Sequence, residues 1–312
     1  MMSKQISELE SELAIVRGFY EADEKAFSES ADPLADKIFY SSTKKRKQDL
    51  EKQLFLLKSE RAHELLSLRL IGNQMAGSIK LRSLTKIVEP LNALLEQCAW
   101  KFWDKEGRAD RIEETFSNLL DLRLAGIESG STKLLILGNT SPDLTGDSAL
   151  EEGLKNIFNV LASSNDEFSD SVHAIGIHAC RSLSRLMDVM EKQNLAAEFS
   201  WGGPDRDYTW EGRPAEIVRI KSILDEIDEP HTETQTITGL IQMLSIRNRI
   251  EIYCPELEKK ISLGYHRSLS KDVESLHLGD KKIFVIEKTT YSFKASSNKR
   301  DVYTLKSIKG EN

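Results

Sequence analysis

Four aspartates in the middle of the chain carry side chains suited to metal-assisted chemistry. Asp143 and Asp147 lie in a loop after a predicted strand, and Asp166 and Asp170 lie near the start of a predicted helix. Carboxylate oxygens are the ligands that magnesium and calcium prefer, but this spacing fits no EF-hand loop. Aspartates at such places commonly cap helices, so we expect no metal site here.

The loop that contains Asp143 has the strand–loop–helix layout of a phosphate-binding loop. It runs from Leu134 to Ser148 but contains neither Gly-Lys-Ser/Thr nor Gly-x-Gly-x-x-Gly, so no lysine reaches a phosphate. Asp143 and Asp147 would also repel an anion. The sequence therefore predicts a structural turn, with Ser148 as helix cap and Glu151 as its capping-box partner, and no bound cofactor.

Cys180 is the candidate nucleophile of the chain. Its neighbour His178 is two positions away on the same predicted helix, so the two side chains point to different faces and cannot act as a dyad. No Cys-x-x-Cys pair exists. We expect Cys98, Cys180 and Cys254 to be buried apolar residues in a reducing compartment, and we assign no catalytic residue.

Aromatic and basic residues are interleaved in the C-terminal part of the chain. Rings on the open face of a small barrel stack bases, and flanking cations hold phosphates. Since side chains alternate between the faces of a strand, only some of these residues can point outward. A protein or peptide ligand and a purely structural role are the alternatives. The residues predicted to contact single-stranded nucleic acid are Arg247, Arg249, Tyr253, Tyr265, Arg267, Lys282, Lys294, Lys299 and Arg300.

A second aromatic group lies in the segment from Trp201 to Trp210. Two glycines separate its first tryptophan from Arg206 and Tyr208. Such a loop suits recognition of a partner, with the rings as anchors. The alternative is a turn between two strands whose tryptophans lie in the core. We keep Trp201, Arg206, Tyr208 and Trp210 as a predicted interaction loop.

The elements that position the first aromatic group form the order β-β-β-α-β-β. Strands are expected at residues 236–244, 249–254, 260–265, 282–293 and 301–308, with a helix at 270–277. This order predicts an OB-type barrel over residues 231–312, a fold that often binds oligonucleotides. That part contains 14 Lys and Arg against 10 Asp and Glu, or +4, so the remainder carries −11 of the total charge of −7.

The N-terminal residues 1–72 predict a helical hairpin. Apolar residues alternate in steps of three and four in the first helix, which is a heptad seam. A second helix is expected from Lys44 to Leu70. The seams must pair with each other, with the body or with another subunit. We predict a protein partner or homo-oligomer through Ile6, Leu9, Leu13, Val16, Tyr20 and Phe27.

Residues 73–230 predict the central part of an α+β protein. Strands at 121–127, 132–138, 195–201 and 207–210 alternate with helices in the order β-β-α-α-β-β-α. This order indicates an antiparallel sandwich with helices on one face of the sheet. The fold expected for the chain is thus α+β, with a helical hairpin, a central sandwich and a small OB-like barrel.

The segment Asp121–Ile136 resembles a stretch in a family of uncharacterised bacterial proteins. In that family an L-R-L…G-S hairpin precedes a D-L-x-G-x-S loop, which here is Asp143–Ser148. An R-x-L-x-x-L-L helix is matched by Arg181–Met187, and a β-rich tail opens with a stretch similar to Gly239–Leu244. The resemblance implies a shared α+β scaffold with a β-rich C-terminal tail and implies no activity.

Composition favours a soluble cytoplasmic protein. No run of eighteen apolar residues exists, and the N-terminus lacks the apolar core of a signal peptide. We expect a non-enzymatic interaction or sensor protein that oligomerises or docks through its helices and binds single-stranded nucleic acid or protein with its barrel. One alternative is an enzymatic effector, a hydrolase or nucleotide-processing enzyme of an antiviral or mobile-element locus, with Asp143, Asp147 or Cys180 in its site. Another is an adaptor that stabilises a partner encoded beside it.

Overall fold

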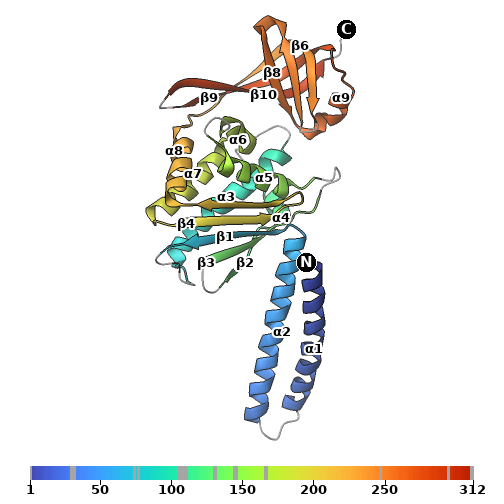
Figure 1. Cartoon of the computed structure of the whole chain (residues 1–312), viewed down its shortest axis with the longest axis vertical. Helices are drawn as coiled ribbons and strands as arrows, with labels where there is room; N and C mark the ends of the chain where they lie inside the picture. Colours follow the sequence, from blue (N-terminus) through green and yellow to red (C-terminus); the bar gives the residue numbers. More distant parts are fainter. Residues whose placement is uncertain are drawn as a thin grey trace.

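The chain has an α+β fold in three parts, stacked along its long axis (Figure 1). The helical hairpin leaves the central body on the sheet side, and the C-terminal barrel packs on the opposite, helical side. This organisation confirms the predicted fold class. The computed structural model describes residues 2–28, 33–72, 75, 78–104, 112–128, 132–142, 147–164, 168–245, 248–293 and 296–309.

The N-terminal hairpin consists of α1 (Met2–Ser28) and α2 (Pro33–Arg61). Leu13 of α1 and Leu50 of α2 are buried, and the rings of Tyr20 and Tyr40 meet across the seam at 5.5 Å between centroids. Ion pairs such as Arg17–Glu51, at 2.9 Å, flank the seam. The heptad seam of α1 is therefore used inside the chain, where α2 covers it.

The expectation of one helix from Lys44 to Leu70 is wrong, because α2 ends at Arg61 and β1 (Leu65–Ile71) follows. His63 adopts a left-handed backbone conformation, with φ of 62°, at the joint. Beyond it, leucines alternate with Ser67 and Arg69, which is the two-residue period of a strand. β1 belongs to the central sheet, whereas a division into independent domains at residues 72 and 230 stays a prediction.

The central sheet has five antiparallel strands in the order β2-β3-β1-β4-β5. β1 is its middle strand, so the hairpin is joined directly to the centre of the sheet. The other strands are β2 (Arg123–Glu128), β3 (Thr132–Leu137), β4 (Ala196–Gly202) and β5 (Asp207–Gly212).

Helices cover one face of this sheet, as the sequence predicts (Figure 1). Leu68 and Phe199 point to the helical face and join the main core, while Ser67 and Arg69 point to the other face. The helices are α3 (Leu81–Trp103), α4 (Glu114–Leu120), α5 (Ala149–Ala162), α6 (Phe168–Ile175), α7 (Ile177–Lys192) and α8 (Pro214–Glu226).

The helix expected over residues 166–193 is interrupted. Gly176 separates α6 from α7 with φ of +81°, a conformation that L side chains rarely adopt. The break turns α6 away from α7. His173 of α6 and Cys180 of α7 therefore lie on separate helices, with Cys180 fully buried and the side chain of His173 largely enclosed.

The C-terminal part is a closed barrel with the strand order β10-β8-β7-β6-β9. β8 and β10 pair in parallel and the other pairs are antiparallel, with α9 (Ser270–Glu274) between β8 and β9. This arrangement is OB-like, as predicted. The strands are β6 (His231–Ser245), β7 (Arg249–Cys254), β8 (Lys259–Tyr265), β9 (Lys281–Phe293) and β10 (Ser296–Lys309).

His173 joins the barrel to the helical layer. Its Nδ1 lies 3.0 Å from the hydroxyl of Tyr291 and its Nε2 lies 3.1 Å from that of Thr304. Burial, with Lys101 and Lys306 nearby, lowers the pKa of His173 to about 3, so the ring is neutral and can both donate and accept a hydrogen bond. The barrel is therefore bonded to α6 through a histidine that must stay unprotonated.

The buried His173 predicts an acid-sensitive contact between barrel and body. The pKa of His173 is lower in the folded chain than its ordinary 6.5. Its contribution to the free energy of unfolding is therefore fully present above pH 6.5 and is lost as the pH falls toward 3. The limit of this loss is about 5 kcal/mol. His173→Gln keeps two hydrogen-bonding groups but cannot titrate. Urea unfolding should show that the free energy of unfolding falls more between pH 7 and pH 4 in the native chain than in the variant. Equal decreases in the two proteins would contradict the assignment.

Candidate functional site

A groove runs along the outer face of β7 and β8, where the barrel meets α6. α6 supplies one wall of this groove through His173 and Ala174, and the barrel strands supply the floor. The β7–β8 groove has a volume of about 340 Å³. Its barrel residues are Arg249, Lys259, Lys260, Ile261, Ser262, Gly264, Asp301, Val302 and Tyr303.

The charge of the β7–β8 groove comes from two cations without a charged partner. Arg249 and Lys260 form no ion pair with any residue that the structure describes. Lys259 donates a hydrogen bond to the hydroxyl of Tyr303 at 3.0 Å. The carboxylate of Asp301 is compensated, because Lys288 lies 3.2 Å from it. The groove is therefore net positive and suits an anion.

Tyr253 lies on the same outer face as these cations. It is the register partner of Lys260, it is half-buried, and its strand neighbours Ile252 and Cys254 point into the barrel core. Arg249 lies on this face at the other end of the ladder, opposite Gly264, with Glu251 between it and Tyr253, and Tyr253 borders the groove without lining it. A ring and cations on one barrel face can stack a base and hold phosphates. Arg249, Tyr253 and Lys260 thus form the candidate site.

The other residues predicted for this site do not join it. Tyr265 packs against the barrel core, and burial raises its pKa. Lys282 lies on β9, which pairs with β6 and β10 and not with β7 or β8. Lys299 and Arg300 are exposed where β10 pairs with the end of β9. Arg247, Lys294 and the side chain of Arg267 lie outside the described residues.

Sequence reasoning missed the lysines of β8. Lys260 and Ser262 alternate with buried Ile261 and Leu263, and this two-residue period was the signal that places them on the outer face. The wall supplied by His173 had no such signal, because it depends on how the barrel packs against α6.

The rings of the predicted interaction loop are covered from within the chain. Trp201, Tyr208 and Trp210 are buried, and Trp201 stacks on Tyr208 at 5.1 Å between centroids. The indole of Trp201 donates to the carbonyl of His63 at 2.7 Å, which ties the turn to the start of β1. Arg206 is exposed, with its guanidinium 4.5 Å from the ring centre of Tyr208. A partner can reach Arg206 but not the three rings.

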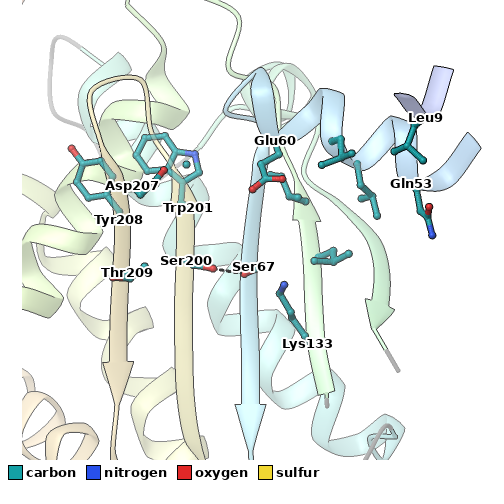
Figure 2. A pocket seen from close by; sticks show the side chains of 15 residues that line it. Leu9, Gln53, Glu60, Ser67, Lys133, Ser200, Trp201, Asp207, Tyr208 and Thr209 are labelled. Atoms are coloured by element: carbon teal, nitrogen blue, oxygen red, sulfur yellow. Dashed lines mark hydrogen bonds between the residues drawn. The ribbon is translucent and has the colours of Figure 1, made fainter. Parts of the chain in front are cut away.

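A second cleft, of about 510 Å³, lies between the base of the hairpin and the sheet face that the helices leave uncovered. Figure 2 shows Ser67 and Ser200 on its floor, with their hydroxyls hydrogen-bonded at 2.6 Å. Leu9 and Gln53 of the hairpin form part of its wall. The cleft is also lined by Glu60, Lys133 and Asp207, so its charged groups are of both signs, in contrast to the positive barrel groove.

The described residues of the enzymatic alternative, Cys180 and Asp147, do not form a common site. Cys180 is fully buried, and burial strongly raises the pKa of its thiol, which opposes formation of a thiolate. Asp147 is exposed, and Asp143 lies outside the described residues. Within the described ranges, no group of three or more His, Cys, Asp and Glu is placed to hold a metal ion.

Comparisons with protein-family models, with curated proteins and with solved structures find no significant match to this chain. The resemblance to an uncharacterised bacterial family therefore stays a prediction. Of the helices in the described part of the chain, none is long and apolar enough to cross a membrane.

Because its cysteines are buried, we expect the native protein not to react with thiol reagents. Cys98, Cys180 and Cys254 are all free and buried, and burial raises the pKa of both Cys98 and Cys180. A thiol-specific reagent such as Ellman's should label none of them in the native state and all of them in denaturant. Rapid native labelling of Cys180 would reopen a nucleophilic role for it.

Proposed function

We propose that this chain is a non-catalytic binding protein whose barrel binds single-stranded nucleic acid in the β7–β8 groove. The observation that carries the proposal is the placement of Arg249 and Lys260, both without a charged partner, on the same barrel face as Tyr253. A phosphate backbone supplies repeated negative charge, and a base supplies a flat surface for the ring.

The spread of the cations favours a strand over a compact anion. Arg249 lies at one end of the β7–β8 ladder, opposite Gly264, and Lys259 and Lys260 lie at the other end. One ring and three cations support contact with a few nucleotides, which is the lower end of the range for OB-type barrels. An acidic peptide offers the same charge without stacking on Tyr253, and it is the competing ligand.

The hairpin supplies the second half of the proposed function, which is docking. It projects from the body along its whole length (Figure 1). Its seam residues Ile6 and Leu13 are buried, whereas Phe27 of the predicted set is 37% exposed, so a partner can reach only part of that set. We place the protein in the cytoplasm, which the three free cysteines support.

Fluorescence anisotropy with labelled oligo-dT and oligo-U at several salt concentrations tests the barrel proposal. For the double variant Arg249→Ala/Lys260→Ala, we expect affinity to fall about 30-fold, since two charge-assisted contacts of about 1 kcal/mol each are lost. The slope of log K against log salt should become shallower by about 1.4. Tyr253→Leu should lower affinity with no change of slope, because stacking carries no charge.

The matched control removes the same charge elsewhere on the barrel. Lys281→Ala/Lys309→Ala changes two exposed lysines that do not line the groove, and it should leave the affinity and its salt slope almost unchanged. Equal losses in the two double variants would show that binding follows overall charge and not the groove. Tighter binding of a polyglutamate peptide than of either oligonucleotide would assign the groove to an acidic protein.

A further inference from the structure

The outer half of the hairpin carries four large apolar side chains that are exposed. Ile15 and Phe19 of α1, with Ile38 and Phe39 of α2, are between 61% and 66% exposed. Exposed apolar residues that gather on one surface commonly mark an interaction site. No part of the body covers them, since the hairpin projects away from it (Figure 1).

Phe19 and Phe39 lie at the same height on the two helices. Their sequence neighbours Tyr20 and Tyr40 touch across the seam, with hydroxyl oxygens 3.1 Å apart. Phe19 follows Glu12 by one heptad, and Phe39 precedes Arg46 by one heptad. Because Glu12 and Arg46 form an ion pair on one side of the hairpin, Phe19 and Phe39 lie on that same side.

The two helices differ in charge. The sequence of α1 contains six acidic and three basic residues, whereas that of α2 contains eight basic and four acidic residues. Two hairpins that face each other with α1 of one opposite α2 of the other would place the more acidic helix against the more basic one. The opposite arrangement, α1 against α1, would place like charges together.

We propose that the occupant of this surface is the hairpin of a second copy of the chain, giving a four-helix bundle. The inference rests on the docking role proposed for the hairpin and names its partner. The two-fold axis runs parallel to the hairpin, so each α1 faces the partner's α2. Phe19 and Phe39 of the two chains then form one layer of four rings, and Glu12 and Arg46 form a layer of ion pairs one heptad away.

The available surface is sufficient for a stable dimer. A helix of 27 residues is about 40 Å long, and two helices side by side are about 20 Å wide. One side of the hairpin therefore offers roughly 800 Å², which is the contribution of each partner to an interface of standard size. Phe19 and Phe39, which lie on the same side of the hairpin, supply large apolar anchors for this contact in the outer half of the hairpin.

Light scattering after size exclusion on the full-length chain tests the proposal. We expect the mass of two chains for the native protein and of one chain for Phe19→Glu/Phe39→Glu. The matched control is Phe55→Glu, because Phe55 is 55% exposed on the opposite side of α2, and this variant should stay dimeric. Circular dichroism must show equal helix content in all three, which excludes unfolding of the hairpin.

A cross-link distinguishes the proposed register from the alternatives. A mixture of Phe19→Cys and Phe39→Cys chains should form a disulfide between chains, and Phe19→Cys alone should not, because each Phe19 faces the partner's Phe39. A monomeric native chain, or a dimer equally disrupted by Phe55→Glu, would overturn the proposal. Cross-linking of Phe19→Cys to itself would overturn the register. Oligonucleotide binding by the same samples is a separate readout, so loss of the dimer and loss of groove binding can be told apart.

Discussion

The packing of the barrel against α6 determines which barrel surface a ligand can reach. His173 makes this contact through the hydroxyls of Tyr291 and Thr304, and it does so as a neutral, buried ring. Because α6 then lies against β10, it adds a wall to the barrel face that Lys259 and Lys260 of β8 share. A barrel held elsewhere would have the same strands and cations without the enclosed site.

The hairpin depends on a different constraint, which is its covalent continuity with the middle of the central sheet. α2 leads through His63 into β1, and the indole of Trp201 donates to the carbonyl of His63. The aromatic turn between β4 and β5 therefore supports the base of the hairpin and is not itself free for recognition. This explains why three rings in a glycine-rich turn are buried.

The local spacing of residues predicted most helices and strands of this fold. It could not predict which elements contact each other. The alternation in β7 and β8 and the heptads of α1 come from residue spacing, so they could be predicted. The four leucines in the segment Leu65–Leu70 suggested a helix, because leucine fits the residue period of a helix as well as that of a strand. The segment is a strand because it pairs with β3 and β4.

The candidate site was predictable only in part, for the same reason. Arg249 and Tyr253 were found from the aromatic and basic pattern, and Lys260 could have been found from the alternation within β8. Tyr265 could be excluded only once the direction of its side chain was known. The wall at His173 could be found only from the position of the barrel on the body.

The most direct test of the central claim is photochemical cross-linking of a labelled single-stranded oligonucleotide to the native protein, followed by mapping of the attached peptides by mass spectrometry. The account predicts attachment within β7 and β8, at Tyr253 and around Lys260. Attachment concentrated on the basic residues of α2, or on the ribbon at Lys299 and Arg300, with β7 and β8 unmodified, would contradict it.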